Sequence, residues 1–223
     1  MPDGNGRPEN AKLAGLPAAY IVAQVRAFHA NERRAAMADW APTHLMSTFT
    51  ADLSDAAIAK AADYFSHQTA RSHVRVVESD RAPGHDVACF IDAPTKGPAA
   101  PLGVAIVELP DDMQRFERRD PHTAYTAYVP VGSLERGRTL ATTGGGGRTQ
   151  PCAACHGADL KGGANLPGPP LAGRFASYLF RQLYGFQSGA RGAAAAQPMQ
   201  GVAAHLTQAD MIDLAAYGAS LDP

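Results

Sequence analysis

The sequence Cys152-Ala153-Ala154-Cys155-His156 indicates more about this chain than any other part of it. A Cys-x-x-Cys-His run is the attachment pattern of a c-type haem. Its two thiols lie one helical turn apart and form thioethers with the haem vinyl groups, and the adjacent histidine lies beneath the iron as its proximal ligand. We therefore predict one covalently attached haem c, held by Cys152 and Cys155, with His156 as a metal ligand.

Two other functions of a Cys-x-x-Cys pair fit this sequence less well. A zinc site needs a second Cys/His pair at matching spacing, but the remaining cysteine, Cys89, stands alone and far away. A thioredoxin-like pair follows a strand and begins a helix, whereas the flanks here are rich in glycine and proline. The preceding stretch, TTGGGGRTQP at 142–151, lacks the Lys-Ser/Thr ending of a phosphate loop and favours a flexible connection.

Met199 is the candidate for the sixth ligand of the iron. It follows His156 by 43 residues and is predicted to lie in a loop just before the last helix. Ligation by His and Met raises the reduction potential and suits electron transfer. The alternative is a methionine that fills a gap in the core.

The chain contains an internal duplication. The stretch from Leu13 to Arg33 matches the stretch from Leu171 to Arg191 at a constant offset of 158 residues. Further along, at an offset of 153 residues, Met46, Leu53, Ile58 and Tyr64 match Met199, Leu206, Met211 and Tyr217. The sequence therefore predicts two copies of one domain.

The first copy retains the counterpart of Met199 but has no Cys-x-x-Cys-His of its own. Met46 is its expected distal metal ligand, and the register of the repeat places Met1 opposite Gly157, directly after the motif of the second copy. Our hypothesis is that the chain is truncated and that the native protein carries a second haem. The alternative is that the first copy has lost its haem.

Composition and charge exclude several classes of protein. The chain has 223 residues, of which 18% are charged and 45% hydrophobic, with a formal net charge of −1. No cluster of Lys and Arg indicates nucleic-acid binding, and no apolar run approaches the length of a membrane span. No secretory signal peptide is visible. With two of three cysteines committed to haem there is no disulfide framework, and Cys89 is expected to be a buried apolar residue.

Helical periodicity appears near both ends of the chain. Helices are predicted over 18–30, 54–67, 133–142, 175–187 and 207–220. Thr207 is the expected N-cap of the last helix. Gly137 is expected to let its helix cross the last helix closely, near Tyr217, the alternative being a tolerated exposed glycine.

The middle of the chain has a different residue pattern. Between 70 and 132, short runs of β-branched and aromatic residues alternate with Pro/Gly-rich turns and predict strands. His73, His85 and His122 are scattered there and are expected to be solvated or structural. We predict a mainly α protein with a helical domain at 1–68, a small β-containing bridge at 69–132 and a helical domain at 133–223 that holds the haem.

Three segments carry a resemblance to a known family: CAACHGADLKG, LAGRFASYLFRQLYGFQSGAR and PMQGVAAHLTQADMIDLAAYGASL. They resemble a class I cytochrome c, and the tandem arrangement resembles the diheme cytochromes of the c4 and c553 type. The resemblance implies two cytochrome c-like helical domains. It also implies a soluble electron carrier in the periplasm, where bacteria attach haem covalently.

The resemblance implies further site residues. The carbonyl of Pro169 would accept a hydrogen bond from the His156 ring, a role that Ala11 would take in the first copy. Tyr178 and Gln182 share one helical face and are candidates for hydrogen bonds near the haem edge, the alternative being simple packing. Two arginines are either counter-charges for the haem propionates or solvated: Arg174 and Arg191.

The predicted function is electron transfer, not catalysis. Redox proteins such as a dehydrogenase or a terminal oxidase are the expected partners. One alternative is a cytochrome subunit docked permanently to a dehydrogenase. The other is a haem sensor or enzyme with a displaceable sixth ligand, against which Met199 argues.

Overall fold

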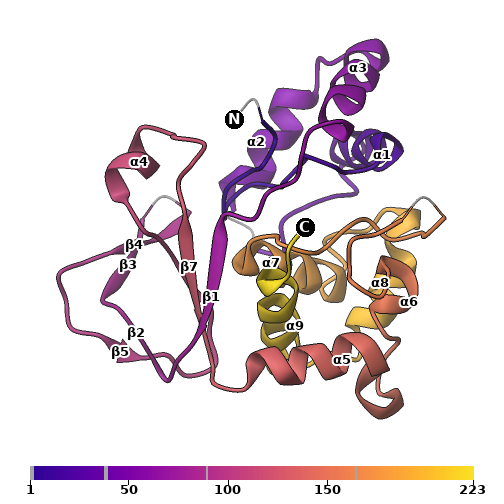
Figure 1. Ribbon diagram of the computed structural model, residues 1–223. Helices are drawn as coiled ribbons and strands as arrows, with labels where there is room; N and C mark the ends of the chain where they lie inside the picture. Colours follow the sequence, from indigo (N-terminus) through magenta and orange to yellow (C-terminus); the bar gives the residue numbers. More distant parts are fainter. Residues whose placement is uncertain (1–2, 38–39, 89, 164) are drawn as a thin grey trace.

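The computed structural model describes residues 3–37, 40–88, 90–163 and 165–223. The positions proposed for Met1 in the repeat and for Cys89 in the core lie outside these residues. Within them the protein is mainly helical, with small sheets (Figure 1). No helix in this described part of the chain has both the length and the apolar character needed to cross a bilayer.

Three helices form the N-terminal part: α1 (Ala18–His29), α2 (Ala41–Thr50) and α3 (Asp55–Ser66). The α1 helix packs on both α2 and α3. Leu16, Ile21 and Ala62 form the small core between them. The first turn of α3 is fixed because the Ser54 hydroxyl accepts a hydrogen bond from the backbone N–H of Ala57, which would otherwise lack a partner.

The strands lie on the opposite side of the molecule (Figure 1). The main sheet has the order β1 (Val74–Glu78), β7 (Tyr125–Val129), β6 (Val107–Pro110), with β1 parallel and β6 antiparallel to β7. Four shorter strands form two ribbons, and α4 (Met113–Glu117) precedes β7. The ribbons pair β2 (Arg81–Ala82) with β5 (Ala100–Pro101), and β3 (His85–Ala88) with β4 (Ile91–Pro94).

The C-terminal helices surround α9 (Gln208–Ser220), which packs against α5 (Ser133–Gly147) and α7 (Ala176–Gln187). The N-cap predicted at Thr207 is confirmed, since its hydroxyl accepts from the backbone N–H of Asp210 and the Asp210 carboxylate accepts from the Thr207 N–H. Shorter elements complete this part: α6 (Ala153–His156), the 3₁₀ turn η1 (Ala194–Ala196) and α8 (Gln197–Ala203).

The close crossing predicted at Gly137 is confirmed. A Cβ at this position of α5 would lie 2.0 Å from the carbonyl oxygen of Asp213 and 2.8 Å from the Cβ of Tyr217, both in α9. Arg136 clamps the crossing, because its Nε and Nη2 donate to the two carboxylate oxygens of Asp213 at 2.7 and 2.9 Å. Position 137 must therefore be a glycine, because any side chain there would collide with the backbone of α9.

The helix predicted over 133–142 leaves regular geometry at the glycine-rich stretch, where Gly144, Gly145 and Gly146 have positive, non-helical φ angles of 69°, 61° and 72°. Two expectations need correction. The Met199 segment is not a loop, because Met199 lies in α8. The α2 helix around Met46 has no counterpart among the predicted helices.

The strands support α7 through one buried carboxylate. Glu108 of β6 is 2% exposed, and its oxygens accept from the backbone N–H groups of Ala176 at 2.9 Å and Ser177 at 3.2 Å, and from the Ser177 hydroxyl. Phe175, the residue before the helix, makes no side-chain cap of its own. A residue 68 positions earlier in the sequence therefore caps α7.

We expect Glu108→Ala to lower the free energy of unfolding by about 2–3 kcal/mol, because it leaves the buried N–H of Ala176 and the partly buried N–H of Ser177 without an acceptor. Denaturant titration measures the effect. Glu117→Ala is the matched control, since Glu117 is exposed in α4 and should change stability by less than about 0.5 kcal/mol. Equal stability of the two variants would contradict the capping role.

Candidate functional site

The Cys-x-x-Cys-His segment folds into the single turn α6. The backbone N–H groups of Cys155 and His156 donate to the carbonyl of Cys152 at 3.2 and 2.9 Å. Gly157 ends the turn with a φ of 87°. Cys152 is half-buried and Cys155 is exposed, and both thiols are free. The two sulfur atoms are thus presented from one short turn.

His156 is buried, with 4% exposure, and its ring is held by one hydrogen bond. Its Nδ1 lies 2.7 Å from the carbonyl oxygen of Pro169, as the sequence predicts. A carbonyl only accepts, so Nδ1 carries the proton and the lone pair resides on Nε2. Burial lowers the pKa of His156, with a smaller contribution from the charge of Arg174, which keeps the ring neutral. A neutral imidazole with a free Nε2 is the form that binds a metal.

The loop after the motif folds back onto the histidine. The N–H of Gly162 donates to the His156 carbonyl at 2.7 Å, and that of Gly168 to the Cys155 carbonyl at 3.1 Å. A Cβ at Gly168 would lie 2.5 Å from His156 Nδ1. Sequence reasoning did not identify Gly168 as a site residue, although its place directly before Pro169 was the available signal.

Cys152 carries an uncharged thiol. Burial raises the pKa of Cys152 to about 11, so this sulfur is a neutral thiol. A thiolate redox pair or a zinc site needs a lowered thiol pKa. Among the residues that the structure describes, no group of three or more His, Cys, Asp or Glu side chains could hold a metal ion. The surroundings therefore fit an uncharged sulfur bonded to a haem.

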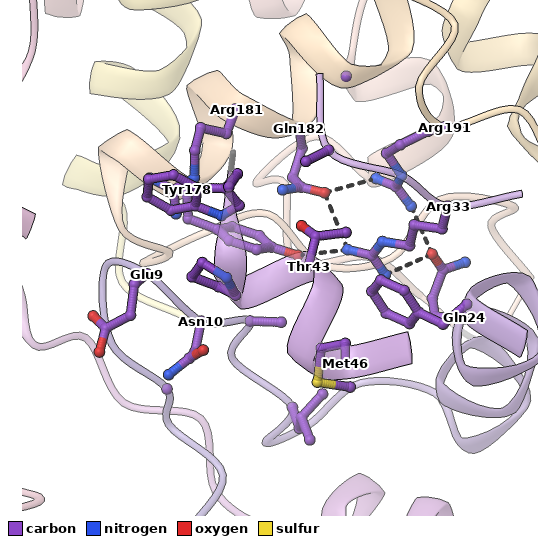
Figure 2. Close-up of a pocket in the computed structure, with 18 of the residues that line it drawn as sticks. Glu9, Asn10, Gln24, Arg33, Thr43, Met46, Tyr178, Arg181, Gln182 and Arg191 are labelled. Carbon is purple, nitrogen blue, oxygen red and sulfur yellow. Dashed lines mark hydrogen bonds between the residues drawn. The ribbon is translucent and has the colours of Figure 1, made fainter. Parts of the chain in front are cut away.

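A large cavity lies between the N-terminal helices and α7 (Figure 2). Its volume is about 1050 Å³, and Met46 lines it from α2. Much of the wall is apolar, contributed by Leu16, Ile21, Phe28 and Phe65. A pocket of this size and character accommodates a large, mostly apolar ligand.

Two arginines meet at the polar edge of this cavity (Figure 2). Arg33 donates to the side-chain oxygens of Gln24 at 2.7 Å and Gln182 at 3.1 Å. Arg191, its counterpart in the repeat, donates to the same two oxygens at 2.7 and 3.2 Å. Each arginine also reaches a tyrosine hydroxyl of the other copy, Tyr178 for Arg33 and Tyr20 for Arg191.

The two arginines of this cluster donate to neutral amide and hydroxyl oxygens, which do not compensate their positive charges. Burial, and then the charge of Arg33, lowers the pKa of Arg191. Burial alone would raise the pKa of Tyr178, but the charges of Arg33, Arg174 and Arg191 outweigh it and lower the pKa. The interpretation of Arg174 and Arg191 as solvated side chains is wrong, since they are 5% and 7% exposed. A buried excess of positive charge is stabilised by an anionic group placed beside it.

The C-terminal part of the chain matches a known protein family. The sequence model of the family described as cytochrome c matches residues 134–222. The "thiosulfate dehydrogenase electron acceptor" of Stutzerimonas stutzeri (strain A1501) is 40% identical over 94 residues, which cover 38% of this chain and 44% of that protein. The match thus spans less than half of the relative's length.

Two solved structures share the fold over nearly the whole chain. The cytochrome c4 of Acidithiobacillus ferrooxidans superposes with a TM-score of 0.60 at 23% identity, covering 96% of this chain and 91% of that one. The thiosulfate dehydrogenase (TsdBA) of Marichromatium purpuratum superposes with a TM-score of 0.63 at 27% identity. That match covers 99% of this chain but 35% of the longer protein.

Proposed function

Residues 134–222 form a cytochrome c domain, and from this premise we propose that the chain carries single electrons through a covalently bound haem c. The observation that carries the proposal is His156, which follows two free cysteines in one turn and has Nδ1 held by Pro169. When bound in such a site, a haem accepts and releases one electron at its iron.

In this proposal the chain supplies all the groups that hold the haem. Cys152 and Cys155 would attach it, and His156 and Met199 would bind its iron. The contact between His156 and Met199 supports the pairing. Two protein ligands leave no position for a substrate or a gas, which suits electron transfer and disfavours the sensor alternative.

We extend the proposal to a second haem in the N-terminal half. The cavity there is large, is lined by Met46 and belongs to the repeated copy. Among the residues that the structure describes, no carboxylate accepts a hydrogen bond from the paired guanidinium groups of Arg33 and Arg191, which would neutralise haem propionates at this edge. Gln182 and Tyr178 then position the arginines and act on the haem edge through them.

The proposed electron donor is a thiosulfate dehydrogenase. A relative that acts as the electron acceptor of this enzyme, and a longer thiosulfate dehydrogenase that contains a matching segment, support this choice. The proposed location is the periplasm, where the bacterial cytochromes that this chain resembles receive their haem. A terminal oxidase as the next acceptor remains a prediction from the sequence.

Haem counting and reduction kinetics test the proposal on the full native protein. We expect two haems per polypeptide by the pyridine-haemochrome method. We also expect rapid reduction by a purified thiosulfate dehydrogenase when thiosulfate is added, and none when it is omitted. Carbon monoxide should bind poorly to the reduced protein, because both axial positions are occupied.

The outcomes separate the parts of the proposal. A count of one haem would show that the N-terminal cavity is not a haem site. Absence of haem from protein made in a host competent for cytochrome maturation would overturn the proposal entirely. Haem-loaded protein that thiosulfate dehydrogenase fails to reduce would refute the donor.

A further inference from the structure

Lys12 is a buried cation at the junction of the N-terminal and C-terminal parts. It is 2% exposed, and its Nζ donates to the carbonyl oxygens of Arg71 and Gly173, each at 2.6 Å. Both acceptors are neutral, and no described residue forms an ion pair with Lys12, so this charge is removed from water without a counter-charge in direct contact. Burial of an unpaired ammonium is costly, which makes the charge state of Lys12 sensitive to its surroundings.

A second buried cation, Arg174, links Lys12 to the haem-binding loop. Its Nη1 donates to the Lys12 carbonyl at 2.7 Å, and its Nε to the carbonyl of Pro170 at 2.6 Å. The residue before Pro170 is Pro169, whose carbonyl holds His156. Contacts therefore run without interruption from Lys12, through Arg174 and the two prolines, to the proposed proximal ligand.

Electrostatic interactions also connect Arg174 with Lys12 and with His156. Burial, and then the charge of Arg174, lowers the pKa of Lys12 to about 7, while Asp3 acts in the opposite direction. The charge of Arg174 also acts on His156. Charges in a poorly solvated interior interact far more strongly than in water. Arg174 therefore acts on the pKa of both Lys12 and His156, and its hydrogen bonds join the segments that hold them.

Other titratable groups face this cluster and must be distinguished from Lys12. They are His73, half-buried with its Nε2 atom unpaired, and the more exposed His122 and Arg71. Burial lowers the pKa of His73, and the charge of Lys12 lowers it further. Burial alone already favours the neutral form of His73, so a proton entering the cluster near neutral pH goes to Lys12.

We propose that Lys12 is a redox-linked proton site: its amine takes up a proton when the haem at His156 is reduced and releases it on oxidation. This rests on the proposed function. The electron comes from the one-electron donor and reduces ferric to ferrous iron. The proton comes from water and converts the Lys12 amine to an ammonium. Reduction removes one positive charge from the haem, so the buried ammonium is less disfavoured.

The midpoint potential of the haem-loaded protein, measured from about pH 5 to pH 9, tests the proposal. In the wild type we expect the potential to fall as the pH rises through about 7. In Lys12→Met the midpoint potential should not change with pH. It should stay at the low value that the wild type reaches at high pH. Lys161→Met, at an exposed lysine, and His73→Gln should both retain the pH dependence.

A second measurement needs no variant. In ¹⁵N-lysine NMR titrations of the wild-type protein, the pKa of Lys12 should be higher in the reduced than in the oxidised state. Equal values in the two states, or a pH dependence that His73→Gln abolishes and Lys12→Met retains, would overturn the inference. A haem-loaded protein with a reversible but pH-independent potential would refute this inference alone. Absence of any haem would refute the proposed function as well.

Discussion

Replacement of Gly137 by alanine is expected to lower the free energy of unfolding by roughly 3 kcal/mol or more and to reduce the yield of haem-loaded protein. The added Cβ would lie 2.0 Å from the Asp213 carbonyl oxygen, which belongs to backbone and cannot rotate away. The bidentate pair between Arg136 and Asp213 also prevents α5 from sliding along α9. The helices would therefore have to separate, and close packing on both sides would be lost.

Gly201→Ala is the matched control for this variant. Gly201 lies in α8, and a Cβ at its position would meet nothing within 4 Å. An alanine in a helix is favoured over glycine by about 0.5–1 kcal/mol, so this variant should be as stable as the wild type or slightly more so. Denaturant titration of both variants gives the comparison. If Gly137→Ala were as stable as Gly201→Ala, the helices could not cross as closely as described.

The helices with strong signals could be predicted from the sequence. The predicted helix over 207–220 appears as α9 within one residue, because Thr207 and Asp210 form a capping box whose partners are three residues apart. Likewise α1, α3 and α7 begin and end within one residue of their predicted limits. These helices are 12 or 13 residues long, enough for the apolar period to be read.

The shorter helices could not be predicted in the same way. In α2 and α8 a proline occupies one of the first two positions, and the helices have 10 and 7 residues. So few turns give little periodicity, and the stretch before α8 consists mainly of alanine. This is why Met199 and Met46 could be identified as candidate ligands while their local structure was missed.

The positions of strands could be predicted from the sequence, but their pairing, which depends on non-local contacts, could not. The β-branched and aromatic runs over 73–79 and 123–130 correctly predict β1 and β7. Their parallel pairing, which aligns Val74 with Tyr125, joins residues 51 positions apart and has no local signature. The same holds for Glu108, whose capping partners in α7 lie in another part of the sequence.

The candidate site also has a local part that could be predicted from the sequence and a part made by distant residues that could not. The Cys-x-x-Cys-His motif and the bond from His156 to Pro169 lie within 18 consecutive residues; the pattern predicted the first, and the family resemblance implied the second. The junction between the two copies depends on Arg33, Arg191 and Lys12, which reach acceptors 149 to 167 residues away. The repeat predicted that the two arginines are counterparts, but only the folded chain brings them together.

Met199→Ala should change the electronic properties of the haem more than any other substitution outside the Cys-x-x-Cys-His motif. In the proposed ligation Met199 is the ligand that raises the potential, so without its thioether the midpoint potential should fall by on the order of a hundred millivolts or more. The vacant position should also let carbon monoxide bind rapidly to the reduced protein. Potentiometry and carbon monoxide difference spectra measure the two effects.

Two further methionines make the test of Met199 specific. Met113 lies in α4 of the strand-containing part, and Met113→Ala should leave the spectrum and the potential unchanged. Met46→Ala should leave the His156 centre unaltered and affect only a second haem, because Met46 lines the N-terminal cavity. An unchanged potential and no carbon monoxide binding in Met199→Ala would show that the iron has another sixth ligand. Since the chain supplies two methionines related by the repeat, the pair of variants assigns each potential to one half of the molecule.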